Sequence, residues 1–440
     1  MGRFSIFDNP VRRYAERIAL IFIAVSAVYS FPNQSVYFAA FCVPLILLII
    51  KDARVVTVGL CIGGQPFFAL FANISGFSIT MVVIAIMCAQ VAMMASTKKA
   101  RNLIKTKVFE KYLLWMSAVF VLIAVSFFLS PESSYNTYYL QFFIIYSLFS
   151  CLSGLLIVQS SMKLEGILTS LLLFFACVFP LFDFTLLKIP SGILYSSIGL
   201  RGEEGMDAIG LGRVSGSLLV ISFLVLIGYV DQRNGAWRYT GIFLVFFITL
   251  PFMWFIQTRQ AMVAAVVTMI FSVSLTYMSG SSLARGRRLS LLLIFVTSAW
   301  LLFFLFNWAV SNLAQSRVTE IYSDDARLDG WVAAWEGITM SPIQGYGLGG
   351  YYMKYSMWPH GWVIEAWYDY GVIGLLFFVV PIFLATRQTV FSSIQWRPWM
   401  LLGSYWIMVA QLSADIPRNT ILFLFFTIAF FSYFSKEIVQ

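Results

Sequence analysis

Long, nearly unbroken apolar segments are the feature that most limits how this chain can fold. A helix needs roughly 20 mostly apolar residues to cross the hydrocarbon core of a bilayer. Fourteen stretches approach that length, which predicts an all-α, polytopic membrane bundle of about 12 to 14 transmembrane helices. The stretches are 16–31, 35–50, 55–73, 78–96, 112–130, 137–159, 166–187, 214–230, 239–256, 261–279, 289–308, 362–385, 398–413 and 419–434.

The composition excludes several classes of protein. Of the 440 residues, 60% are hydrophobic and 11% are charged, whereas a soluble domain carries about 25% charged residues. A soluble enzyme, a disordered chain and a nucleic-acid-binding domain are therefore excluded. The five cysteines all lie inside apolar stretches, so we expect neither disulfides nor a metal site.

The basic residues predict the orientation of the bundle. With the N-terminus in the cytoplasm and alternating crossings, 21 of the 29 basic residues fall on the cytoplasmic side. This agrees with the excess of Lys and Arg that cytoplasmic loops of membrane proteins carry. The net charge of +9 is thus a topology signal and implies no nucleic-acid partner. The first apolar stretch follows Arg3, Arg12, Arg13 and Arg17, and we interpret it as a retained signal anchor.

Two outward loops, about 188–213 and 309–361, are longer than a simple connection requires, and long ordered loops tend to be functional. The second divides the chain into a membrane bundle of about 11 crossings (1–308), an extracytoplasmic loop (309–361) and C-terminal membrane helices (362–440). Within this loop, apolar residues at spacings of 3, 4 and 7 predict an amphipathic helix on the outer membrane face. They are Leu328, Trp331, Val332, Trp335 and Ile338.

A glycine-rich stretch follows that helix. Pro342 ends the helix, and Gly345, Gly347, Gly349 and Gly350 allow either a sharp turn or close approach of the backbone to a ligand. The stretch is not a dinucleotide-binding motif, because no strand precedes it. The acidic residues Asp324, Asp325 and Asp329 nearby are interpreted as a solvated loop rather than a metal site.

Three outward arginines are candidate anion-binding residues. Arg259 lies in WFIQTRQAMVAA, between two apolar segments with almost no loop, where a charge is costly unless it meets a polar cavity or a partner. Arg213 begins an apolar segment, and Arg327 lies in the long loop. Each side chain either extends to lipid headgroups or binds an anion, a role that suits the planar guanidinium with its five donors.

His360 is the only histidine in the chain, in MWPHGWVIEAWYDYG just before an apolar segment. Its ordinary pKa near 6.5 suits a general base. Glu365 and Asp369 follow within the first turns of that segment, where ionisable groups usually face the protein interior. We expect either carboxylate to support or orient the imidazole.

Together these segments resemble the superfamily of O-antigen ligases and O-antigen polymerases. Its recurring features are an arginine in an S-R-G-like corner, an earlier R-x-S/T-G, then R-x-x-x-W, P-x-x-G-x-G, H-N and G-x-x-G. The resemblance covers about 213–260 and 325–375, with Gly361 in place of the usual asparagine and Thr258 in place of the corner serine. The matching segments are QTRQ at Arg259, RVSG at Arg213, RLDGW at Arg327, PIQGYGLGG from Pro342, PHG at His360 and GVIG from Gly371.

The resemblance implies an inner-membrane glycosyltransferase with a periplasmic active site and no cofactor. Its donor and acceptor would be undecaprenyl-diphosphate-linked oligosaccharides, with membrane lipids and a chain-length regulator protein as further partners. Arg213, Arg259 and Arg327 would bind the diphosphate, His360 would be the base, and Gly345 and Gly347 would support the site. Loss of the H-N pair favours a polymerase of O antigen, capsule or exopolysaccharide over a ligase that uses lipid A core. A transporter or flippase is the alternative from another class.

Overall fold

The computed structural model describes residues 52–63, 79–95, 106–130, 134–164, 208–227, 259–278, 326–356, 361–392, 395–412 and 419–434, together with residues 49, 167, 168, 171, 249, 253 and 359. All regular structure within these ranges is helical. Besides a helix at 52–63, the helices are α3 (Ile79–Ala95), α5 (Lys107–Leu129), α6 (Ser134–Ser160), α9 (Ala208–Leu226), α11 (Arg259–Met278), α14 (Ala326–Met340), α15 (Gly350–Tyr355), α16 (Trp362–Phe391), α17 (Arg397–Leu412) and α18 (Leu422–Phe434).

The described helices agree with the hydropathy pattern. Three stretches, Lys107–Leu129, Tyr139–Ser160 and Trp362–Phe391, are long and apolar enough to cross a membrane, and α9, α11 and α18 contain shorter apolar helices. The chain is therefore a helical membrane protein. The predicted segments 16–31, 35–50, 166–187, 239–256 and 289–308 lie wholly or almost wholly outside the described residues.

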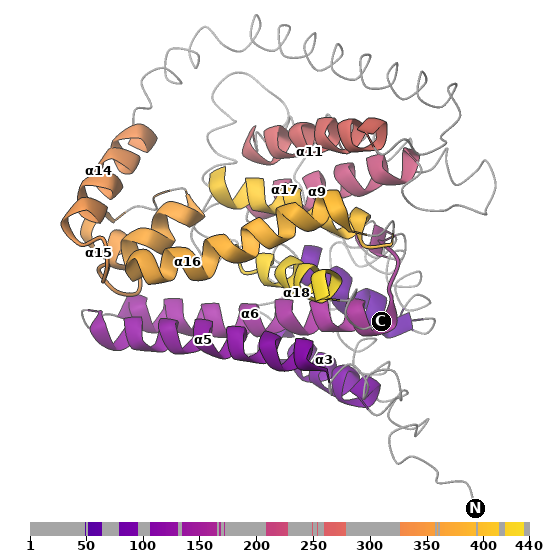
Figure 1. Cartoon of the computed structure of the whole chain (residues 1–440), viewed down its shortest axis with the longest axis horizontal. Helices are drawn as coiled ribbons and strands as arrows, with labels where there is room; N and C mark the ends of the chain where they lie inside the picture. The colour runs from indigo at the N-terminus through magenta and orange to yellow at the C-terminus, as the bar shows by residue number, and fades with distance from the viewer. Residues whose placement is uncertain are drawn as a thin grey trace, which may run out of the picture.

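The helices form two groups that meet at α16 and α18 (Figure 1). On one side, α18 packs against α6 and α5, and α6 also contacts α3. On the other side, α17 packs against α16, and α11 packs against both α9 and α17. Close approach between α6 and α18 depends on Gly154, where a Cβ atom would lie 2.6 Å from Cβ of Thr427.

The outer surfaces of the spanning helices are apolar. Phe128 of α5 is 82% exposed, and Leu376 and Phe383 of α16 are exposed as well. Because lipid tails are as apolar as these side chains, such exposure is favourable in a bilayer and unfavourable in water. The arrangement supports the membrane assignment independently of helix length.

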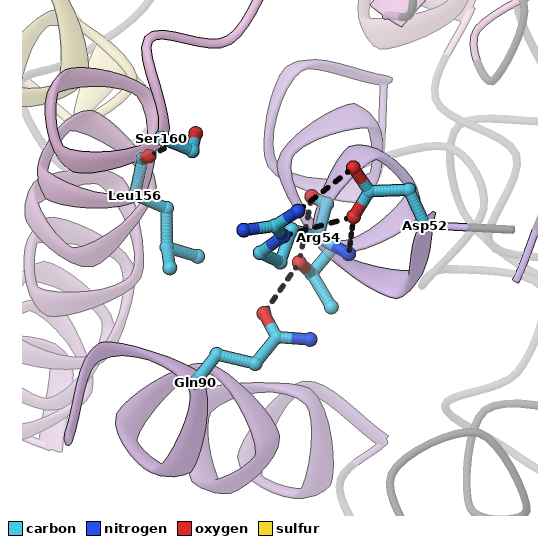
Figure 2. A network of polar contacts seen from close by, with 6 residues as sticks. Asp52, Arg54, Gln90, Leu156 and Ser160 are labelled. Atoms are coloured by element: carbon cyan, nitrogen blue, oxygen red, sulfur yellow. Dashed lines mark hydrogen bonds and ion pairs between the residues drawn. The ribbon is translucent and has the colours of Figure 1, made fainter. Parts of the chain in front are cut away.

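A polar network joins the helix at 52–63 to α3 (Figure 2). Nε of Arg54 lies 2.9 Å from Oδ1 of Asp52, and the Thr57 hydroxyl lies 3.0 Å from Oε1 of Gln90. The ion pair is partly exposed and contributes little stability, whereas the bond to Gln90 satisfies a buried amide. Gln90 is one of the few polar residues inside the predicted segments, and its contact with Thr57 joins two packed helices.

Candidate functional site

Helix α14 is present where the loop sequence predicts it, but its apolar residues divide between two faces. Ile338 is buried, whereas Trp331 is 39% exposed and Val332 and Trp335 are each 57% exposed. Small residues form the buried face: Ala334 is fully buried, and a Cβ atom at Gly337 would collide with the Tyr368 ring of α16. The helix therefore packs on α16 mainly through small side chains, and its two tryptophans remain partly exposed.

Tyrosine hydroxyls fasten α14 to the residues that follow it. Tyr351 donates to the carbonyl oxygen of Gly330 at 2.8 Å, Tyr346 to that of Gly337 at 3.0 Å, and Tyr355 to that of Ala333 at 3.3 Å. Burial raises the pKa of Tyr351 to about 12, so its hydroxyl remains protonated and able to donate at physiological pH. Three hydrogen bonds spread along the helix hold α14 in one orientation.

The glycine-rich stretch forms a tight turn whose amide groups bond within the protein. Gly345, Gly347 and Gly349 have φ of 71°, 84° and 68°, values that favour glycine. The sequence allowed either a sharp turn or close approach of the backbone to a ligand, and the backbone geometry of these glycines shows the sharp turn. The amides of residues 345–351 donate, in order, to Ser341 O, Tyr368 O, Asp369 O, Ser126 O, Asp369 Oδ2, Gly347 O and Asp369 Oδ1.

This turn docks at a break in α16. Gly371 has φ 64° and ψ −164°, and a Cβ atom there would collide with the carbonyl oxygen of Ile343. The amide of Val372, which follows the break, donates to the carbonyl oxygen of Pro342 at 2.9 Å. The first glycine of GVIG thus allows the loop backbone to contact the helix backbone directly.

The two carboxylates predicted beside the histidine are both buried, at 1% exposure for Asp369 and 2% for Glu365. Asp369 holds the glycine-rich turn, since its oxygens lie 3.0 Å from the amide nitrogens of Gly349 and Tyr351. Oε1 of Glu365 accepts the hydroxyl of Tyr139 in α6 at 2.8 Å. Asp369 therefore holds the glycine-rich turn in place, and Glu365 links α16 to α6.

His360 itself lies outside the described residues, but both of its neighbours are described. The Trp331 indole donates from Nε1 to the carbonyl oxygen of Pro359 at 2.7 Å. Gly361 is the N-cap of α16. Arg327 lies one turn before Trp331 on α14, and its side chain is outside the described part. The first half of α14 therefore contacts the residue that precedes His360.

Arg213 is 2% exposed, inside α9. The Tyr405 hydroxyl of α17 donates to the Arg213 carbonyl oxygen at 2.8 Å, and Gly216 makes room for it, since a Cβ atom there would collide with that hydroxyl. The glycine of RVSG therefore has a packing role. Six residues further along α17, about 9 Å at 1.5 Å per residue, Gln411 accepts the amide of Val363 at the start of α16.

These contacts locate Arg213 at about the depth of Asp369, because α16 and α17 pack side by side and Asp369 also lies six residues from Val363. Arg259 is the first residue of α11, which packs against both α9 and α17; its side chain is outside the described part. In the described part of the chain, no three His, Cys, Asp or Glu side chains are grouped to hold a metal ion.

No protein-family model, curated protein or solved structure matches the chain. The family resemblance therefore stays a prediction from the motifs. Sequence reasoning did not single out Tyr139, Tyr351, Tyr355 or Tyr405, whose hydroxyls fasten the site. For Tyr139, near the start of the segment 137–159, the available signal was a tyrosine at a membrane boundary, where an apolar ring with a polar end is favoured.

Proposed function

We propose that this chain is a glycosyltransferase that polymerises the repeat units of a bacterial polysaccharide. It transfers a glycan from undecaprenyl diphosphate to a hydroxyl of the next lipid-linked repeat unit. It lies in the inner membrane with about 12 to 14 crossings, and its active site faces the periplasm. No cofactor is required, because the activated bond arrives with the lipid-linked donor.

The burial of Arg213 is the observation that carries this proposal. The side chain is 2% exposed within an apolar helix of a membrane protein. A guanidinium group does not lose its charge at any physiological pH, and a charge buried in a membrane protein usually faces a partner or a functional cavity. A diphosphate at the membrane surface is an anion of the charge and geometry that arginine binds well.

A second arginine is available near the same helices. Arg259 begins α11, which packs against α9 and α17. A third arginine, Arg327, is the second residue of α14, which packs against α16. Two or three fixed cations would stabilise the negative charge that develops on the leaving diphosphate. Each of these arginines lies in the first third of its helix. This position favours catalysis at the membrane interface over transport, which usually requires ionisable groups near the bilayer midplane.

The reaction requires one proton transfer. The acceptor hydroxyl oxygen forms a bond to the anomeric carbon of the donor sugar, and the bond from that carbon to the diphosphate oxygen breaks. The leaving undecaprenyl diphosphate keeps the bonding electron pair, and the hydroxyl proton passes to His360. Neutral imidazole is the form that accepts it, and a pKa near 6.5 keeps that form abundant at pH 7.

The experiment supplies purified protein in detergent with one diphosphate-linked repeat unit and no other acceptor, and resolves the products on a gel. A ladder of multiples supports a polymerase, since donor and acceptor are then the same kind of molecule. Transfer that begins only after lipid A core is added would replace the polymerase with a ligase. Folded protein that transfers nothing under either condition would overturn both and favour a transporter.

A further inference from the structure

Two cations from different helices are held on one aromatic pair at the end of α18. Nζ of Lys111, near the start of α5, lies 4.9 Å from the centroid of the Phe434 ring. Cζ of Arg387, near the end of α16, lies 4.7 Å from the centroid of the Tyr433 ring. The Tyr433 and Phe434 ring centroids are 4.8 Å apart, so the aromatic pair brings the two positive charges to one place.

Both charges are available to an anion. In the described part of the chain, neither Lys111 nor Arg387 makes an ion pair, although the exposed Glu110 is next to Lys111. Arg387 also lies 5.6 Å from the centroid of the Phe391 ring. Contact with an aromatic ring holds a cation without neutralising its charge, and it leaves N–H groups able to donate to an acceptor.

These cations lie at a membrane boundary. From the break at Gly371 to Phe391, α16 rises about 30 Å at 1.5 Å per residue, which matches the thickness of the hydrocarbon core. The other end of α5 contacts the glycine-rich turn, because the Ser130 hydroxyl donates to the Leu348 carbonyl oxygen. The start of α5 is therefore on the opposite side, which the sequence predicts to be cytoplasmic; residues 98–111 contain six basic residues and one acidic residue.

Exposed apolar side chains continue from each cation towards the bilayer interior. Leu114, one turn after Lys111 on α5, is 73% exposed, and Phe383, one turn before Arg387 on α16, is 65% exposed. Residues one turn apart share a helix face. Each helix thus presents a positive charge at headgroup level above an apolar surface, which suits a lipid with acyl chains better than a free anion.

We propose that Lys111 and Arg387 bind the headgroup of an anionic phospholipid in the cytoplasmic leaflet. The guanidinium suits a phosphodiester because its planar fork donates to two oxygens, and the ammonium adds a second charge. A zwitterionic lipid has the same phosphodiester, but its own cation compensates the charge, so the site selects by net charge. The site does not depend on the proposed glycan transfer.

The test titrates full-length protein in detergent with dioleoylphosphatidylglycerol or dioleoylphosphatidylcholine and counts bound lipids by native mass spectrometry. Lys111→Gln, Arg387→Gln and the double variant remove charge and keep long polar side chains. Lys354→Gln is the matched control, because Lys354 also lies over an aromatic ring, 5.1 Å from the Tyr355 centroid, but beside the glycine-rich turn. Inorganic phosphate is added as a competitor in a third set of titrations. Equal Tm values without lipid establish that the variants are folded.

We expect wild type and Lys354→Gln to bind phosphatidylglycerol about 25-fold more tightly than phosphatidylcholine, since each basic residue contributes about fivefold. Each single variant should lose about fivefold in affinity for phosphatidylglycerol, and the double variant should lose the preference. A double variant with wild-type affinity, or a wild type that binds both lipids equally, overturns the inference. Displacement of phosphatidylglycerol by millimolar phosphate would also overturn it, because the site would then bind a free anion rather than a lipid.

Discussion

Tyr139 of α6 donates its hydroxyl hydrogen to Oε1 of Glu365 in α16 at 2.8 Å, and both side chains are buried. The bond joins two helices of membrane-spanning length. A carboxyl group inside such a helix is costly unless hydrogen bonds compensate for lost hydration. The pair therefore stabilises the bundle where α16 begins.

Removing this donor should destabilise the protein. Tyr139→Phe keeps the ring and deletes the hydroxyl, so the buried Oε1 loses a hydrogen bond, at an expected cost of about 1–3 kcal/mol in the free energy of unfolding. Thermal unfolding in detergent measures the loss as a lower Tm. Tyr433→Phe, at a half-buried tyrosine of α18, is the control and should unfold like wild type. Equal Tm values for the two variants would contradict the assigned role of Tyr139.

The break in α16 makes a separate prediction about Gly371. Alanine there would need a positive φ and would collide with the carbonyl oxygen of Ile343, so Gly371→Ala should cost at least about 2 kcal/mol. Gly361→Ala is the control, because φ there is −161° and the nearest contact of the new Cβ would be 3.3 Å, to the end of the Ile364 side chain. The comparison is made by thermal unfolding. A Gly371→Ala protein as stable as Gly361→Ala would show that the loop does not dock at the break.

The sequence was sufficient to predict most of the described helices, because hydropathy and spacing are local properties. It predicted the helix that became α14, but it could not show which residues that helix buries. The apolar stripe predicted a face towards the membrane, and its residues Trp331 and Trp335 are partly exposed. The face that packs on α16 is made by Gly337, Ala334 and Ile338. Small residues permit such close approach without adding to a hydrophobic pattern.

The role of the glycine-rich stretch also depended on distant partners. The sequence allowed a turn or a ligand-binding backbone, and the choice rests on where the amides donate. Leu348 bonds to Ser126 of α5, 222 positions earlier, and Gly349 bonds to the carboxylate of Asp369. No local pattern encodes such pairings. His360 and the side chains of Arg259 and Arg327 lie outside the described part, so their catalytic roles stay predictions.

The carboxylate of Asp369 predicts a change in the dynamics of the glycine-rich turn. Asp369→Asn replaces one acceptor oxygen with an N–H₂ group that opposes an amide donor. Hydrogen exchange of residues 345–351 should accelerate at least about tenfold, which corresponds to about 1.4 kcal/mol less protection. Mass spectrometry of peptides covering the turn measures this exchange. Asp329→Asn, at an exposed position of α14, should leave this exchange unchanged. Equal protection in both variants would show that the Asp369 side chain does not hold the turn.

The assignment of the catalytic residues makes the last prediction. His360→Ala and Arg259→Ala should each abolish transfer, a loss of at least about a hundredfold, while membrane insertion remains intact. Arg259→Lys should also be poor, because a point charge does not replace the planar fork of a guanidinium. Lys354→Ala removes another cation of the loop 309–361, one that lies 5.1 Å from the Tyr355 ring centroid, and should retain activity. Each variant is compared with wild type by ladder formation at equal amounts of inserted protein, and wild-type ladders from both alanine variants would remove His360 and Arg259 from the site.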